Sequence, residues 1–468
     1  MSQEQLDVRV TAAVEAALAQ MEQLDQLAQL DRTAWRLVSA RRLSGGAINQ
    51  NFLVELNDEQ GRTIRWVLRR GQSAGIPGTH GRTQEFALCE FAFSLGLTLP
   101  RPLALVQTDE GPVSFFEFCE GQADGRRLMQ SMASNPTAAR TLTRQLGCEL
   151  GRLHQASASD RAATRLVDVL GPRPDNAVLA AMTLLEKSLA AVRQPAAYLT
   201  QAAQAVLAEG QQLAAGVGKP TPATVCHNDF RLGNLMAHPE SGQLTAVLDW
   251  EFAAWGDLLA DVGWLSAACW RFGGQQPVAG FGQLEDLVDG LAQTLEAHQT
   301  QALRSRLPVE LAFWQRFAHL RWAIIAAQQG ERVVSGDAEA LELTITGAMS
   351  ASLVEPVVSH YTGLSLAQLA AAPAVSPGAT MTQPASTADR LLKEAALHLR
   401  QHLGAQLSGS GKYSAVMAAN AIRLARGRLA LAARQAKPLV PASGIEAPFT
   451  SQALDDLVAD LQVWSFKG

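Results

Sequence analysis

One stretch of the chain, Cys226-His-Asn-Asp-Phe-Arg-Leu-Gly-Asn-Leu-Met236, constrains what it can fold into more than any other. It holds His227, Asp229 and Asn234 in an H-x-D-x-x-x-x-N pattern, and a D-x-E sequence begins at Asp249 after a strand-like Leu-Thr-Ala-Val-Leu segment. Each short pattern occurs often by chance, and a charged residue in a loop is usually only solvated. Their occurrence together, in this order and on a strand–loop–strand frame, predicts one functional site.

These residue types suit phosphoryl transfer. That reaction requires a carboxylate that orients the attacking hydroxyl and accepts its proton, and oxygen ligands that hold Mg²⁺ against the phosphates. Asp229 suits the first role, and Asn234 and Asp249 suit the second, because Mg²⁺ prefers hard oxygen ligands. We expect His227 to pin the loop through hydrogen bonds, and Glu251 to make a further or water-mediated magnesium contact.

The combined pattern resembles the signature of the aminoglycoside phosphotransferase and choline-kinase-like superfamily. Gly256–Gly263 is similar to that family's G-D-P-x-x-D-L-G segment, with Leu258 in place of proline. The resemblance implies an α+β, protein-kinase-like bilobal fold with a small antiparallel β lobe and a helical lobe. It also implies ATP and Mg²⁺ as cofactors. Asp257 and Asp261 would then tie the magnesium loop to the next helix and cap that helix.

The N-terminal part of the chain resembles the same family more weakly. Ser44, Gly45, Gly46 and Asn49 lie in a loop between two β-like stretches, where glycines let backbone N–H groups approach phosphates closely. An ordinary hairpin turn is the alternative interpretation. The predicted nucleotide contacts of this loop therefore depend on the resemblance.

Val-Leu-Arg-Arg at 67–70 occupies the place of the strand that carries a lysine in kinases, and Arg69 stands where the family often has that lysine. Arginine keeps the positive charge but binds phosphate as a fork rather than as a point. The resemblance implies Glu85 as its partner; an exposed arginine and an exposed glutamate are the alternative. It also implies that adenine binds at an interlobe hinge near Glu117 and Cys119, and that His154 is a packed structural histidine.

The order of the predicted segments suggests several domains. Two β-like stretches flank 57–62, which has turn composition and predicts a hairpin, and Gln84–Leu95 predicts a helix. Residues 371–388 contain three prolines and no charge, which indicates a flexible linker. We expect an N-terminal helical segment, a kinase-like β lobe, a helical lobe with the catalytic motifs, the linker and a C-terminal helical accessory domain, at 1–35, 36–121, 122–370, 371–388 and 389–468.

The composition of the chain limits the classes of binding partner that we expect. The formal net charge of −5 gives no reason to expect nucleic-acid binding, which usually requires a basic face. No uninterrupted apolar run approaches the ~18 residues of a membrane span, so no membrane partner is expected. The five cysteines are scattered without C-x-x-C spacing, and we expect a cytoplasmic protein. The sequence leaves the oligomeric state open.

The acceptor is predicted to be a small molecule with a hydroxyl group. The V-L-R-R, D-W-E and G-D-x-x-x-D-x-G combination resembles kinase domains associated with acyl-CoA dehydrogenases, which implies a hydroxyacyl-CoA thioester and a role in hydroxy-acid catabolism. The region after Asp261 lacks the dense acidic cluster that a polycationic aminoglycoside would favour. An aminoglycoside or other small-alcohol kinase remains an alternative. A nucleotide-binding pseudokinase or partner-binding module is the alternative of another class, although it would usually have lost one of the three motif residues.

Overall fold

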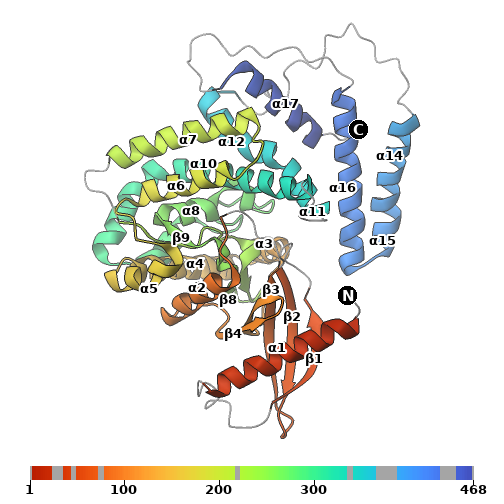
Figure 1. The fold of residues 1–468 in the computed structure, drawn as a ribbon. Helices are drawn as coiled ribbons and strands as arrows, with labels where there is room; N and C mark the ends of the chain where they lie inside the picture. Colours follow the sequence, from red (N-terminus) through yellow and green to blue (C-terminus); the bar gives the residue numbers. More distant parts are fainter. Residues whose placement is uncertain are drawn as a thin grey trace. The chain divides into compact units, whose positions relative to one another are not determined.

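The computed structural model in Figure 1 describes residues 3–23, 35–43, 49–71, 78–216, 222–334, 341–364, 387–432 and 449–465. By its internal contacts the chain divides into two compact units, Met1–Ala181 with Lys219–Gln315, and Met182–Gly218 with Arg316–Gly468. This division differs from the domain boundaries expected from the sequence. The predicted loop residues Ser44, Gly45 and Gly46, and residues 371–386 of the predicted linker, lie outside the described residues.

A five-stranded antiparallel sheet forms the N-terminal part of the first unit. Its strands lie in the order β1-β2-β3-β5-β4. They are β1 (Arg36–Arg42), β2 (Asn49–Asn57), β3 (Thr63–Gly71), β4 (Pro102–Thr108) and β5 (Gly111–Glu117). Alternate apolar side chains of these strands pack with helix α1 (Gln3–Gln23) into one core, which includes Phe52, Trp66 and Phe115. The sequence did not predict β4.

The predicted hairpin connects β2 and β3. Asn57 pairs with Thr63 at its end, and the side chain of Asp58 closes the turn by accepting from the backbone N–H groups of Gln60 and Arg62. Helix α2 (Arg82–Ser94) follows β3 and confirms the helix predicted at Gln84–Leu95. It packs against β4 and β5.

The rest of the first unit is mainly helical. Its helices are α3 (Gly125–Ser134), α4 (Pro136–Ser157), α5 (Asp160–Leu170), α8 (Leu258–Ser266) and α9 (Leu284–Ala292). Two short antiparallel pairs interrupt them, β6 (Thr224–Cys226) with β9 (Ala254–Gly256), and β7 (Leu235–Ala237) with β8 (Leu244–Val247). These pairs hold the loops that carry the predicted site. The helices α6 (Ala177–Ala190) and α10 (Ala297–Val334) continue into the second unit.

All the secondary structure in the described residues of the second unit is helical. Besides parts of α6 and α10, it contains α7 (Ala197–Gly216), α11 (Leu341–Ala348), α12 (Ser350–Thr362), α14 (Thr387–Leu397), the π-helical turn η5 (His398–Leu403), α15 (Gly404–Gln406), α16 (Gly409–Ala432) and α17 (Ser451–Ser465). Helix α17 packs on α7, where the Tyr198 hydroxyl donates to Asp460 at 2.9 Å. Ile345, Leu424 and Val463 form an apolar cluster among α11, α16 and α17. The C-terminal helices therefore share a core with helices that precede the predicted linker.

One stretch of this unit, Leu341–Thr362, is long and apolar enough to cross a membrane by length and composition. It consists of α11 and α12, and 44% of its most apolar window is buried within the protein. The Ser350 hydroxyl donates to the carbonyl of Ala323 at 2.9 Å, and the Leu353 carbonyl lies 3.1 Å from His319 Nδ1. These contacts are typical of a core helix packed on its neighbours. The α+β class, with an antiparallel sheet, a mainly helical remainder and C-terminal helices, is confirmed.

Candidate active site

Residues 227–234 carry the predicted catalytic residues and begin directly after β6; we call them the catalytic loop for that prediction. Its first two backbone N–H groups, those of His227 and Asn228, each donate to a different carboxylate oxygen of Asp261 at 2.8 Å. Asp261 lies in helix α8 and is fully buried. Asn228 has a φ of 61°, in the left-handed region that asparagine tolerates better than most residues. One buried carboxylate therefore holds the backbone at the start of the loop.

His227 connects the catalytic loop to the strand β8 region. Its side chain is fully buried, Nε2 donates to the carbonyl of Leu248 at 3.0 Å, and Nδ1 accepts from the backbone N–H of Asp229 at 3.2 Å. This pair of bonds defines the tautomer with the proton on Nε2. Burial lowers the pKa of His227, against the opposite effect of Asp261 and Asp229. The ring is therefore a neutral structural connector at neutral pH.

The buried carboxylate of Asp229 is held from three directions. Its Oδ1 accepts from Arg231 Nε at 2.9 Å and from Trp264 Nε1 at 3.2 Å, and its Oδ2 accepts from Asn234 Nδ2 at 2.5 Å. The guanidinium of Arg231 also stacks on the ring of Trp270, 4.4 Å from its centroid. Sequence reasoning missed Arg231 and Trp264. The position of Arg231 two residues after Asp229 was a usable signal, whereas only the packing of α8 places Trp264.

Pairing of β7 with β8 brings Asn234 close to Asp249. Leu235 pairs with Val247, and the Leu248 N–H donates to the Asn234 carbonyl at 2.8 Å. Asp249 then begins a turn with a φ of 61°, an uncommon conformation for a residue other than glycine. Burial raises the pKa of Asp249, but Arg69 and Arg231 more than offset this and hold the pKa below its ordinary value. The two predicted magnesium ligands are thus positioned by one short hairpin.

Arg69 on β3 forms ion pairs with two other predicted site residues. Its guanidinium contacts Glu85 of α2 at 2.9 Å and Asp249 at 2.5 Å. Burial lowers the pKa of Arg69, and Asp249 and Glu85 reverse this, so that the pKa lies above its ordinary value. Arg82, which sequence reasoning also missed, pairs with the second carboxylate oxygen of Glu85. The sheet, helix α2 and the acidic turn at Asp249 are therefore connected through a chain of ion pairs.

The remaining predicted nucleotide residues are less completely described. Asn49 begins β2 opposite Gly71, and its side chain lies outside the described residues. Glu117 ends β5 and is exposed, and Cys119 follows it as a half-buried thiol whose pKa burial raises. Glu251 lies in the turn after Asp249, where its backbone carbonyl accepts from His80 at 2.8 Å.

Asp257 and Asp261 divide the roles expected of them. Asp257 caps α8 through the N–H of Leu259 at 2.9 Å and pairs with Arg306 at 2.8 Å. Asp261 is bound to the catalytic loop rather than to the magnesium loop, which corrects the expectation for that residue. The reason is geometric, because Asp261 lies one helical turn into α8 and faces the end of β6.

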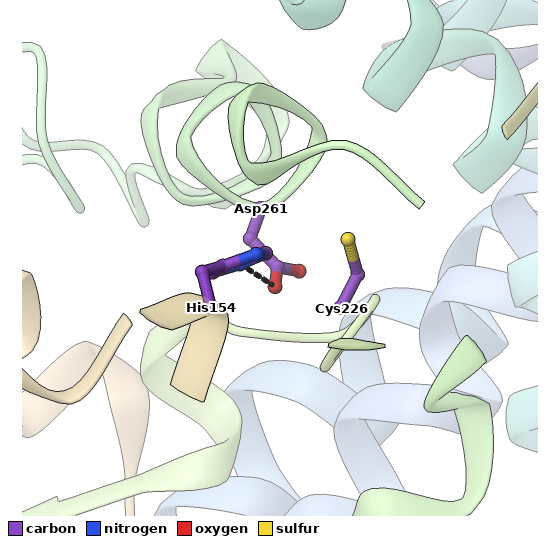
Figure 2. Close-up of side chains that lie close together, drawn as sticks. All are labelled: His154, Cys226 and Asp261. Atoms are coloured by element: carbon purple, nitrogen blue, oxygen red, sulfur yellow. Dashed lines mark hydrogen bonds and ion pairs between the residues drawn. The ribbon is translucent and has the colours of Figure 1, made fainter. Parts of the chain in front are cut away.

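His154, Cys226 and Asp261 lie together in the core (Figure 2). Their possible ligand atoms are within 4.8 Å of one another, a separation at which they could hold a metal ion. The atoms are already engaged in hydrogen bonds, however. His154 Nδ1 lies 2.5 Å from Thr224 Oγ1 and Nε2 lies 3.4 Å from Asp261, while the Cys226 thiol donates to the Asp257 carbonyl at 3.2 Å. This cluster is a buried hydrogen-bond network around the catalytic loop, and His154 is packed as expected.

A family model described as "Phosphotransferase enzyme family" matches residues 39–296 of the 468. The match covers more than half of the chain and both parts of the site. The chain belongs to this family. It is a phosphotransferase of the kinase type, and its fold is protein-kinase-like. The predicted family and enzyme class are confirmed.

Individual relatives are more distant. The mouse protein acyl-CoA dehydrogenase family member 10 is 26% identical over 317 residues, which are 66% of this chain and 28% of that protein. The match thus spans little more than a quarter of that relative's length. A candidate aminoglycoside phosphotransferase from Ralstonia eutropha is 18% identical over 74% of this chain and 96% of that chain, with a TM-score of 0.49. An aminoglycoside phosphotransferase from Streptomyces rimosus, solved with ADP and streptomycin, is 14% identical over 65% and 98%, with a TM-score of 0.34.

Proposed function

We propose that this phosphotransferase moves the terminal phosphoryl group of ATP, with Mg²⁺, to the hydroxyl group of a hydroxyacyl-CoA. The observation that carries the reaction type is the convergence of Asp229, Asn234 and Asp249 on two adjoining loops, with Arg69 paired to Asp249 at 2.5 Å. A carboxylate, an amide and a nearby cation are the groups that phosphoryl transfer requires.

The donor set suits magnesium. Asp249 and Asn234 supply oxygen atoms of the type that Mg²⁺ prefers, and Glu251 lies two residues beyond Asp249. When bound, the ion would neutralise charge on the phosphates. Arg69 would contribute a second positive charge from the sheet side. Asp249 is held ionised by Arg69, so the site would be ready to accept a cation without first losing a proton.

Asp229 is the proposed base. The acceptor hydroxyl would hydrogen-bond to its carboxylate, the hydroxyl oxygen would form a bond to the terminal phosphorus, and the bond from that phosphorus to the bridging oxygen would break. The proton would pass to Asp229 and ADP would leave. Hydrogen bonds from Arg231, Trp264 and Asn234 hold the carboxylate of Asp229 in one orientation. The base would therefore already be oriented when the substrate binds.

The acceptor class is supported by the sequence resemblance to kinases associated with acyl-CoA dehydrogenases and by the similarity to the mouse relative of that name. Screening purified protein for ATP consumption with 3-, 4- and 5-hydroxyacyl-CoAs, choline-like alcohols and aminoglycosides tests it. We expect turnover with at least one hydroxyacyl-CoA and a product whose mass corresponds to a phosphate ester.

Asp229→Asn is the matched control for this screen, because it keeps the side-chain shape. A general base typically contributes on the order of 10²–10⁴-fold, so the variant should lose most turnover while still binding nucleotide. Turnover with aminoglycosides and with none of the hydroxyacyl-CoAs would refute the proposed acceptor class. Nucleotide binding without transfer to any alcohol would favour a pseudokinase.

A further inference from the structure

The segment before helix α2 is bound to the acidic loop, which we define as residues 249–253. The backbone N–H of His80 donates to the carbonyl of Glu251 at 2.8 Å, and the His80 ring nitrogen Nε2 lies 2.7 Å from the carbonyl oxygen of Ala253. A carbonyl oxygen only accepts, so Nε2 carries a proton and donates it. One residue therefore contacts the acidic loop at two points, two residues apart.

These contacts are continuous with helix α2. The first turn of α2 includes the bond from the Glu85 N–H to the carbonyl of the N-cap residue Gly81 at 2.9 Å, and His80 directly precedes Gly81. Glu85 then pairs with Arg69, and Arg69 pairs with Asp249 at the start of the acidic loop. The acidic loop is thus connected to the α2 region at both of its ends. Ion pairs through Arg69 connect the first end, at Asp249, and the two hydrogen bonds of His80 connect the other end.

The acidic loop needs such a restraint because Asp249 adopts a left-handed φ of 61°. An aspartate in that region persists when surrounding contacts hold it there. The ion pair with Arg69 fixes the side chain of Asp249, and the buried ring of Trp250 in the following turn packs on His227. The two bonds of His80 hold the backbone of the same turn at Glu251 and Ala253.

We propose that His80 is a positioning residue that holds the acidic loop against helix α2, so that Asp249 and the Arg69–Glu85 pair present a preformed magnesium–nucleotide site. The inference rests on the proposed function, since it assigns the Asp249 loop to magnesium. No role was predicted for His80 from the sequence, and His80 acts through the loop rather than on the substrate.

The test compares ADP binding with and without Mg²⁺ in the full-length protein, measured by calorimetry, for His80→Ala and His80→Gln. Loss of one net hydrogen bond changes an equilibrium by a few-fold to about tenfold. We therefore expect the tightening of ADP binding by Mg²⁺ to fall by about that factor in His80→Ala, with little change in metal-free ADP binding. His80→Gln, whose amide can donate to the same carbonyl, should recover part of the effect.

His298→Ala is the matched control, because this histidine belongs to the same unit and its side chain is 75% exposed. It should behave as the unchanged protein. Wild-type magnesium dependence in His80→Ala would overturn the inference. Equal loss in the alanine and glutamine variants, with metal-free binding also impaired, would also overturn it by showing a packing role alone.

Asp249→Ala separates this result from the proposed function. If Asp249→Ala keeps full magnesium-dependent ADP binding, the magnesium assignment itself fails. If Asp249→Ala loses it and His80→Ala does not, only the role of His80 fails.

Discussion

Replacing Asp261 by alanine removes the carboxylate that holds the catalytic loop. In the folded protein this side chain is fully buried and accepts from the backbone N–H groups of His227 and Asn228 at 2.8 Å each. His154 Nε2 lies 3.4 Å from the same carboxylate. Alanine offers no acceptor to these groups, and burial keeps water from replacing it.

The cost follows from the two N–H groups that lose their acceptor. A buried donor left without a partner costs about 1–3 kcal/mol, so the pair predicts a loss of about 2–6 kcal/mol. That is a large fraction of the ~5–15 kcal/mol by which a domain is usually stable. Asp261→Asn keeps one acceptor oxygen, and we expect it to lose about half as much.

Urea unfolding, followed by circular dichroism, measures this free energy from the transition midpoint. The control is Asp160→Asn, because the Asp160 side chain is 96% exposed in its pair with Arg173. An exposed ion pair is worth at most about 1 kcal/mol, so this midpoint should hardly change. A loss below about 1 kcal/mol in Asp261→Ala, equal to that of the control, would refute the view that Asp261 anchors the loop.

Four further outcomes are expected. Asp249→Ala should abolish activity at ordinary magnesium concentrations, while Asn234→Ala should lower it less, because an amide supplies no charge to the ion; steady-state rates at varied Mg²⁺ test the ranking, which the opposite order would contradict. Arg69→Lys should raise the Michaelis constant for ATP but by less than Arg69→Ala, because lysine replaces the fork with a point charge; unchanged ATP kinetics in Arg69→Ala would assign the residue no part in nucleotide binding. Trp264→Phe, which removes one hydrogen bond to the proposed base, should lower kcat about tenfold at an unchanged Michaelis constant for ATP, and an unchanged kcat would show that the bond is dispensable. The folded-state pKa of His227 is depressed, so the contribution of its neutral ring to stability should be complete above the unfolded pKa of about 6.5. That contribution should be lost as the pH falls, because protonation then favours the unfolded protein. Urea midpoints measured between pH 7.5 and pH 5 should therefore fall less in His227→Gln than in the unchanged protein.

The local part of the site could be predicted from the sequence. Asp229, Asn234 and Asp249 were predicted to form one site from two short motifs, and a short β-hairpin brings their loops together. The partnership of Arg69 with Glu85 was also predicted, and the structure places these two side chains 2.9 Å apart. That prediction came from the family resemblance, because nothing in the spacing of two residues on different elements indicates a contact.

Other parts of the site depend on contacts between distant segments. The bond of Trp264 to Asp229 spans 35 positions, and the bond of His80 to Ala253 spans 173. Asp261 was predicted to bind the wrong loop, because its sequence neighbours suggest the preceding acidic turn. Its actual partners are set by the packing of α8 against β6.

The sequence by itself determined the kind of chemistry and the order of the main elements, since motif spacing, turn composition and apolar periodicity act over short separations. Only the tertiary structure decided which helices share a core. Residues 389–468 were expected to form a separate domain behind the linker, yet Tyr198 of α7 bonds to Asp460 of α17 across 262 positions. A proline-rich, uncharged segment indicates that the chain can change direction there. Which helices the C-terminal residues then pack against depends on the apolar surfaces of those helices and of the C-terminal helices. Those surfaces form only after each helix has folded and exposed one face.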